Sequence, residues 1–151
     1  MRNNPERAVE LFKEGYNCSQ AVLAVYCDEL GLDMETAMKL SSSFGGGMGR
    51  LREVCGAVSS MFMVAGLKFG YDNPKAGPVK EKHYKMIQEL AERFKMENGS
   101  IVCRELLGLK VHHDTPAPEA RTDEYYKKRP CSEIVKCAVE ILEEAIGYTT
   151  K

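Results

Sequence analysis

Apolar residues recur at spacings of three and four along almost the whole chain of 151 residues. This is the period of one face of an α-helix, whereas a half-buried strand alternates every second residue. No such alternation persists anywhere in the sequence, and neither an internal repeat nor a low-complexity tract is present. The spacing therefore predicts an all-α fold, a compact helical bundle of about five to seven helices.

The segment from about 52 to 69 differs from the other predicted helices because it is apolar or small on nearly every side. A helix of that kind is expected at the centre of a bundle, buried by its neighbours. The apolar surface of this helix would serve equally well as the interface of a homodimer. With this one core, the length of the chain predicts a single domain over residues 1–151.

Polar residues and glycines mark where the predicted helices begin and end. Asn17 is expected to cap a helix running from Cys18 to Leu30, and Asp33 the short helix after it. Ser100 is expected to cap a short helix that carries Cys103. Residues 108–129 hold two prolines and many charges, so they predict an excursion over the surface with about one helical turn.

Composition excludes several classes of function. Lys and Arg number 21 against 22 Asp and Glu, and no basic stripe is present, so a nucleic-acid partner is not expected. The first ten residues are polar and charged, without the apolar region of a secretory signal. No apolar stretch approaches the roughly 20 residues of a membrane span. We therefore expect a soluble, cytoplasmic protein with no membrane partner.

Six cysteines are unexpected in such a protein. Cytoplasmic thiols are kept reduced and structural disulfides are rare there, so the cysteines indicate buried small side chains, a metal site or redox chemistry. The chain contains no Cys-x-x-Cys pair, and so neither a zinc ribbon, a thioredoxin-type motif nor covalent c-type haem is expected.

Four of the six cysteines follow a helix-start signal, and they are Cys18, Cys55, Cys103 and Cys131. The start of a helix carries unpaired N–H groups and a partial positive charge, which together stabilise a thiolate. Cys27 and Cys137 instead fall inside predicted helices, on apolar stripes, and are expected to be inert core thiols. The pattern predicts a thiol site assembled from several helices, unless all the cysteines merely pack.

The glycine-rich run of residues 45–49 precedes Cys55. It lacks the spacing of either phosphate-binding glycine motif, and no strand precedes it. We interpret it as a loop whose backbone approaches a partner closely, with Arg50 and Arg52 placed to favour a thiolate at Cys55. The alternative is a flexible connector with solvated arginines. His112, His113 and Asp114 further along are adjacent side chains that point in different directions, so a solvated loop is expected there rather than a metal site.

Five segments taken together resemble the C-GCAxxG-C-C family of redox-active proteins. They are NCSQAVL at 17–23, FGGGMG at 44–49, EVCGAVS at 53–59, CRELLG at 103–108, and Cys131 followed by AVEILEE at 138–144. The resemblance extends over about residues 5 to 147 and places the family's four cysteines on Cys18, Cys55, Cys103 and Cys131. The family's central Gly-Cys-Ala-x-x-Gly is not literal here, because the local run is VCGAVSS at 54–60, with serine at its final position. A related module occurs in split-Soret cytochromes, where a cysteine-bound iron–sulfur cluster has been considered.

Three hypotheses for function remain. In the first, the four cysteines perform thiol–disulfide or electron-transfer chemistry with an unidentified redox partner, Cys55 being the attacking thiolate and Cys18, Cys103 or Cys131 resolving the mixed disulfide. An enzyme of this kind would be an oxidoreductase. In the second, the same four thiolates bind an iron–sulfur cluster or zinc. In the third, the chain is a non-enzymatic helical module whose cysteines are structural.

Overall fold

The polypeptide forms helices of very different lengths joined by short connections. The computed structural model describes residues 3–111 and 113–147, so His112 lies outside the described residues. Six longer helices are α1 (Asn4–Lys13), α2 (Cys18–Ala24), α4 (Met34–Ser42), α6 (Gly56–Phe69), α7 (Pro78–Asn98) and α10 (Cys131–Ala145). Four shorter ones are α3 (Cys27–Leu30), α5 (Gly45–Met48), α8 (Cys103–Leu106) and α9 (Asp123–Lys128). The prediction of an all-α fold is confirmed, and across 3–111 and 113–147 the only β pairing is an isolated bridge between Val54 and Val102.

The predicted caps define the starts of two helices. The Asn17 side chain accepts a hydrogen bond from the Gln20 N–H at 2.9 Å, and the Gln20 side chain accepts from the Asn17 N–H at 3.1 Å. This reciprocal pair is a capping box, which satisfies two N–H groups at the start of α2. The Asp33 side chain caps α4 in the same manner, through the Thr36 N–H at 2.9 Å.

Two predicted helix boundaries differ from the structure. The expected helix from Cys18 to Leu30 is interrupted after Ala24, so that Cys27 becomes the first residue of α3. Ser100 does not cap α8, because its hydroxyl accepts from the Val102 N–H at 3.0 Å and Val102 itself occupies the cap position. At residues 25–26 a turn interrupts an apolar pattern that is compatible with a continuous helix, whereas after Ser100 the helix begins two residues later than expected.

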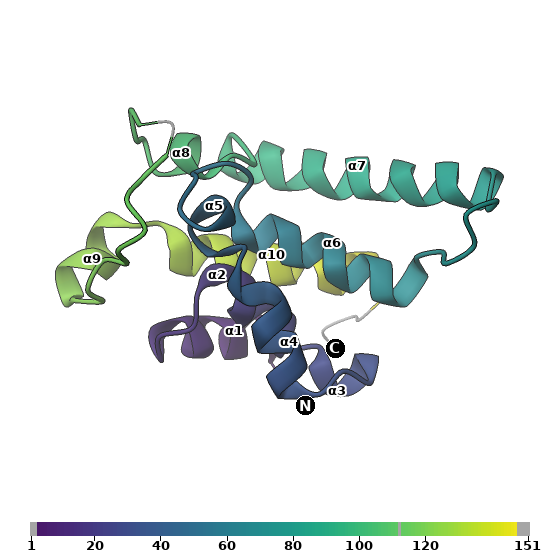
Figure 1. Ribbon diagram of the computed structural model, residues 1–151, viewed down its shortest axis with the longest axis horizontal. Helices are drawn as coiled ribbons and strands as arrows, with labels where there is room; N and C mark the ends of the chain where they lie inside the picture. The colour runs from purple at the N-terminus through teal and green to yellow at the C-terminus, as the bar shows by residue number, and fades with distance from the viewer. Residues whose placement is uncertain (1–2, 112, 148–151) are drawn as a thin grey trace.

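Helix α6 occupies the centre of the bundle. It packs against α2, α7 and α10, and Figure 1 shows it between α7 and α2 with α10 behind. Its first half is almost completely buried, including Val58 and Met61, whereas Leu67 and Phe69 near its end are exposed. The predicted buried central helix is therefore confirmed over most of its length.

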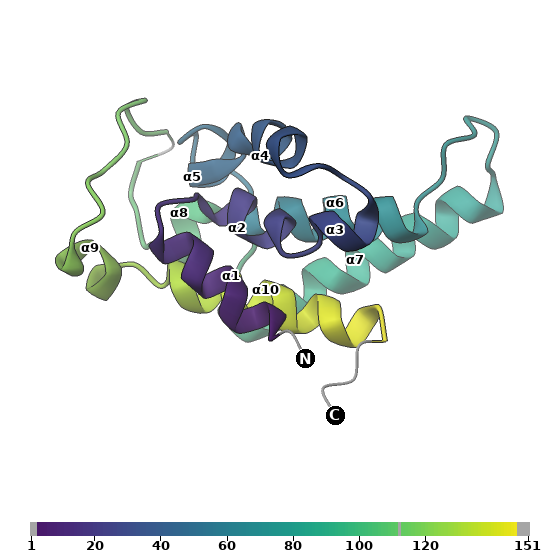
Figure 2. The same ribbon diagram turned by 90° about the horizontal axis from the view of Figure 1, so that it is seen from below.

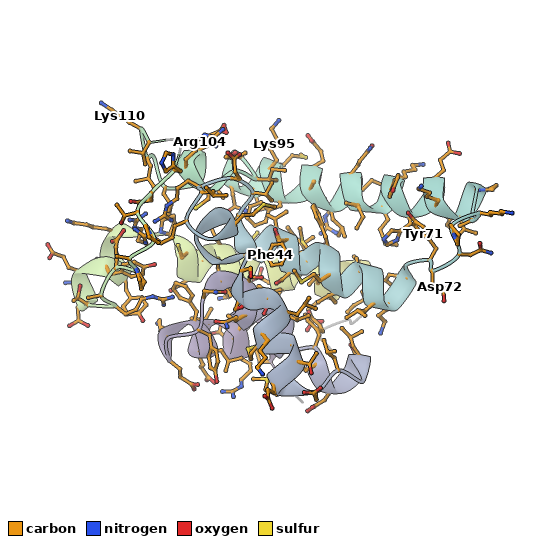
Figure 3. The ribbon with its side chains drawn as sticks, viewed as in Figure 1. Phe44, Tyr71, Asp72, Lys95, Arg104 and Lys110 are labelled. Carbon is orange, nitrogen blue, oxygen red and sulfur yellow. The ribbon has the colours of Figure 1, made fainter. Side chains whose placement is uncertain are left out.

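The helices are arranged so that several of their starts lie at one end of the molecule. Figure 2 shows α1 lying along α10, which agrees with the extensive contact between them. Helix α7 runs alongside α6 to the far end, where Figure 3 labels Tyr71 and Asp72, while Arg104 and Lys110 lie at the end near α8 and α9.

Within the described part of the chain, no helix has the length and apolar character needed to cross a membrane.

Candidate functional site

The four predicted site cysteines all lie at helix starts. Cys18, Cys103 and Cys131 are the first residues of α2, α8 and α10, and Cys55 is the cap residue that precedes α6. All four line one cavity of about 60 Å³, together with side chains that include Asn17, Arg52, Arg121 and Tyr125. The fold thus brings together four thiols that are far apart in the sequence, as the helix-start pattern predicted.

The isolated β bridge places Cys55 opposite Ile101 and Cys103 opposite Glu53. The Cys55 N–H donates to the Ile101 carbonyl at 2.8 Å, and the Cys103 N–H donates to the Glu53 carbonyl at 2.6 Å. These two bonds flank the Val54–Val102 pair, so the chain segments entering α6 and α8 run antiparallel. This pairing fixes the relative positions of the two segments that lead into α6 and α8.

Cys18 has surroundings that stabilise a thiolate. A hydrogen bond from the Cys55 thiol lowers the pKa of Cys18 most strongly. Burial opposes this effect, and backbone N–H groups of Gly46, Ser19 and Gly56 lower the pKa further, to about 6. Cys18 is therefore largely ionised at neutral pH, whereas a thiol with the ordinary pKa of 9.0 would be largely protonated.

The other three thiols are held in the protonated form. The hydrogen bond to Cys18 and then burial raise the pKa of Cys55 well above its ordinary value. Burial raises the pKa of Cys103, although the Arg52 guanidinium, whose Nη1 lies 3.5 Å from the Cys103 Sγ, acts in the opposite direction. Burial and the charge of Cys18 raise the pKa of Cys131 to about 12. One thiolate therefore lies among three thiols.

The predicted surroundings of Cys55 are corrected by these contacts. Arg50 and Arg52 were expected to favour a thiolate at Cys55, but both guanidinium groups pair with Asp114 at 3.1 Å, and Arg52 also reaches Cys103. Arg50 and Arg52 are close to Cys55 in the sequence, but the fold directs them elsewhere. Both residues adopt positive φ angles, which change the direction of the chain. The thiolate expected at Cys55 belongs to its neighbour Cys18.

The glycine run brings backbone close to a neighbouring segment, as expected, although Gly45–Met48 forms the short helix α5, with positive φ angles at Gly46 and Gly47, rather than a loop. A Cβ added at Gly47 would lie 2.5 Å from the Cβ of Cys103, and Gly47 also has a φ of 68°. A Cβ added at Gly56, just beyond Cys55, would lie 2.6 Å from the Cys18 Sγ. Neither position has room for a side chain. The interpretation as a flexible connector with solvated arginines is therefore wrong.

Arg121 is a site residue that the sequence did not reveal. Its guanidinium lies over the Phe12 ring, 4.2 Å from the ring centre, and donates to the Phe12 carbonyl at 2.9 Å and the Tyr16 carbonyl at 3.1 Å. These contacts fasten the excursion between α8 and α9 to the end of α1, over the cysteine cavity. The excursion carries many charges, and nothing in its pattern distinguishes Arg121 from a solvated arginine.

Cys27 and Cys137 do not line the cavity. The Cys27 thiol donates to the Leu23 carbonyl at 3.4 Å, and the Asn98 amide donates to the Cys137 Sγ at the same distance. Burial raises the pKa of both thiols. Their expected role as protonated packing groups agrees with this environment, even though Cys27 begins a helix.

A metal site requires donors that converge more closely than these cysteines do. Four thiols are the ligand set that zinc and iron–sulfur clusters prefer. Over the described ranges, however, no group of three or more His, Cys, Asp and Glu side chains is arranged to hold a metal ion. The chemistry of the four thiols fits a soft metal, but their positions as folded do not.

Asp114 belongs to the triplet of His112, His113 and Asp114 that was expected to form a solvated loop. Its carboxylate instead forms ion pairs with Arg50 and Arg52.

Comparison with protein families identifies the relationship. The family described as "Putative redox-active protein (C_GCAxxG_C_C)" matches residues 16–145, which include all four cavity cysteines. The chain belongs to the C_GCAxxG_C_C family. Comparisons with curated proteins and with solved structures gave no match. Membership of this redox-active family supports a redox role in general terms.

Ser60, the last residue of the run that departs from the family's central motif, is hydrogen-bonded to the residue that follows Cys18. The Ser60 hydroxyl donates to the Ser19 carbonyl at 2.6 Å and lies 2.6 Å from the Ser19 hydroxyl. Both serines are completely buried. In this member of the C_GCAxxG_C_C family, the serine therefore links α6 to the first turn of α2, one residue after Cys18.

Proposed function

We propose that Cys18 and Cys55 form a redox-active dithiol that exchanges with disulfides. The observation that carries the proposal is that Cys18 and Cys55 lie at two helix starts on the wall of one cavity, where the surroundings lower the pKa of Cys18 and raise that of Cys55. Thiol–disulfide exchange requires one thiolate to attack and a second thiol within reach to resolve the intermediate. The two thiols have these opposite protonation states and line the same cavity.

The exchange balances in two steps. The Cys18 thiolate attacks a disulfide RSSR, forming a bond between Cys18 and one sulfur and releasing RS⁻. Cys55 then loses its proton to a released thiolate and attacks Cys18, which forms the Cys18–Cys55 disulfide and frees the second RS⁻. The protein loses two electrons and the disulfide gains them, and a dithiol reductant reverses the sequence.

Cys103 and Cys131 have a supporting role in this proposal. Both line the same cavity, and both are held protonated by burial. The negative charge on Cys18 raises the pKa of each thiol as well. Replacing Cys103 or Cys131 by serine is therefore expected to slow exchange less than replacing Cys18 or Cys55.

The test is to react the reduced protein with hydroxyethyl disulfide and to map the products by mass spectrometry. We expect a Cys18–Cys55 disulfide in the unaltered chain and an accumulated mixed disulfide at Cys18 in Cys55→Ser. Cys18→Ser is expected to abolish both products. Exchange at an undiminished rate in Cys18→Ser would overturn the proposal.

Binding of a metal by the same four cysteines is the second candidate, and the single cavity that they share favours it. Because the thiols do not converge as folded, it requires them to move toward one another. Anaerobic purification followed by metal analysis and an absorption spectrum separates the two functions. Stoichiometric iron or zinc that disappears in Cys55→Ser would replace the dithiol proposal, whereas a colourless, metal-free protein would support it.

A further inference from the structure

A second, wider pocket adjoins the cysteine cavity. It has a volume of about 290 Å³ and lies between the glycine run and the excursion that precedes α9. Five residues line both spaces, and they are Asn17, Gly46, Arg52, Arg121 and Tyr125. A small molecule in the wider pocket therefore contacts residues that also line the cavity of Cys18.

Three arginines line this wider pocket, and they are Arg50, Arg52 and Arg121. Arg50 and Arg52 share the single carboxylate of Asp114, so one positive charge of the two is not balanced there. Arg121 pairs with carbonyl oxygens and aromatic rings, which leave its charge in place. Glu119 is the carboxylate that lines the same pocket, and it is paired with Arg129. The charges around the pocket therefore sum to a positive value.

Arg52 supplies an independent indication of a ligand. Its side chain is only 5% exposed, and its Nε has no hydrogen-bond partner although it is buried. A buried donor without a partner costs free energy, so such groups are uncommon unless something else occupies the site. Arg52 lines both the wider pocket and the cysteine cavity, and an anionic ligand there would provide an acceptor for this donor.

We propose that the arginine pocket binds the carboxylate or other anionic group of a small disulfide or thiol whose sulfur reacts at Cys18. This inference rests on the proposed function, because it assigns a substrate class to the same dithiol. Arg52 and Arg121 line both the wider pocket and the cysteine cavity. An anionic group held by these two arginines and Arg50 would therefore direct the sulfur of a short substrate toward the cysteine cavity. The positive pocket also offsets the repulsion between an anionic substrate and the Cys18 thiolate.

Three small disulfides of similar size test the charge preference. They are dithiodipropionate with two carboxylates, neutral hydroxyethyl disulfide, and cystamine with two ammonium groups. We expect the dianion to form the mixed disulfide at Cys18 about tenfold faster than the neutral compound, and cystamine to react more slowly than either. The preference should decline at high salt. Equal rates for all three would overturn the anion site while leaving the dithiol proposal intact.

Variants locate the preference. Arg50→Gln should bring the rate for dithiodipropionate to within about threefold of the neutral rate, and Arg50→Lys should retain much of the preference. Lys80→Gln is the matched control, because Lys80 lies over the Tyr71 ring at the opposite end of the molecule (Figure 3). An Arg50→Gln variant with an unchanged preference would contradict the assignment.

A binding experiment separates the anion site from the redox chemistry. Octanedioate has the length of dithiodipropionate but no sulfur, so its binding to Cys18→Ser can be measured by calorimetry without any exchange. We expect binding that is weakened in Cys18→Ser/Arg50→Gln. Binding of octanedioate together with no exchange in the unaltered chain would support the site and overturn the proposed function. Absence of binding would overturn the site.

Discussion

The starts of α2 and α3 place a cysteine at the same position of two successive helices, but the two thiols have opposite properties. The pKa of Cys18 falls to about 6, whereas burial raises the pKa of Cys27. Asn17 precedes Cys18 in an extended conformation with a ψ of 170°, so the N–H groups of the first turn of α2 lack a preceding turn of helix. The Gln20 N–H bonds to the Asn17 side chain, and the Ser19 N–H remains available to the Cys18 thiolate.

Tyr26 precedes Cys27 in a helical conformation, with a ψ of −2°. The Cys27 thiol donates to the Leu23 carbonyl of the preceding helix, which holds the proton on sulfur. Burial is the largest influence on its pKa, and the negative charge of Asp28 acts in the same direction. The comparison shows that a helix start stabilises a thiolate only where the chain enters from outside the helix and a donor faces the sulfur.

The largest expected difference between the two regions is in ionisation at neutral pH. Cys18 should be about nine-tenths thiolate, and Cys27 at most a few per cent, a difference of at least about thirtyfold. An ultraviolet titration of the thiolates should show a step near pH 6, matching the pKa of Cys18. We expect Cys18→Ser to lose this step and Cys27→Ser to retain it. The reverse pattern would invalidate the comparison.

The same ionisation makes stability depend on pH. An unfolded Cys18 titrates near ~8.5, above its pKa of about 6 in the fold, so its contribution to stability is complete above ~8.5 and is lost as the pH falls through 6. Cys55 has a raised pKa in the fold, and its contribution declines as the pH rises above ~8.5. Chemical unfolding should therefore show the pair contributing most near pH ~8.5. Cys18→Ser should lose the rise on the acid side.

Removing the Cys55 thiol should raise the pKa of Cys18 and so make its ionisation more like that of Cys27. A hydrogen bond to a charged group contributes about 1.5–3 kcal/mol, so Cys55→Ala should raise the pKa of Cys18 by about 1 to 2. Cys55→Ser retains an O–H donor and should change the pKa less. The same titration measures both variants. A Cys18 pKa that is unchanged in Cys55→Ala would mean that the backbone N–H groups suffice.

Filling the space beside Cys18 should disturb the thiolate from the other side. Gly56→Ala places a Cβ 2.6 Å from the Cys18 Sγ, and crowding of this kind typically costs about 1–3 kcal/mol of unfolding free energy. Gly66→Ala on the same helix has no atom within 4 Å and should stabilise by roughly 0.5–1 kcal/mol. Denaturant unfolding of the two variants gives the comparison. An equal change in unfolding free energy in the two variants would show that a side chain at position 56 does not crowd the Cys18 sulfur.

The smallest expected effect concerns the cap that sets the entry of the chain. Asn17→Ala should cost about 1 kcal/mol of unfolding free energy and raise the pKa of Cys18, because the first turn of α2 loses its capping box. Asp33→Ala removes a comparable cap from α4 and should cost a similar amount without affecting Cys18. An equal change in the Cys18 pKa in both variants would mean that the cap acts only through general stability.

Local signals made much of the fold predictable. Asn17 and Asp33 cap helices as expected, and the apolar segment after residue 55 forms the central helix. The helix-start pattern also selected the four cysteines that line one cavity. These features depend on a few consecutive residues or on a short apolar period, both of which are visible in a sequence.

The arrangement of charges and protons within the site was not predictable in this way. The choice of Cys18 over Cys55 as the thiolate depends on one hydrogen bond between residues far apart in the chain. The direction of Arg52 toward Cys103 depends on positive φ angles at Arg50 and Arg52, which neither residue type indicates. Likewise, the Val54–Val102 pair is too short to produce an alternating pattern.

The close contact of Gly56 with Cys18 has a further consequence for stereochemistry. Exchange at sulfur proceeds with the attacking, central and leaving sulfur atoms nearly in a line. Gly56 closes one side of the Cys18 sulfur, and the Cys55 thiol and the Gly46 N–H occupy others. These groups restrict the approach of an incoming disulfide to the Cys18 sulfur, and the departing half is directed away from Cys18 in a linear exchange. The site should consequently discriminate between disulfides by the bulk of the half that becomes bonded to Cys18.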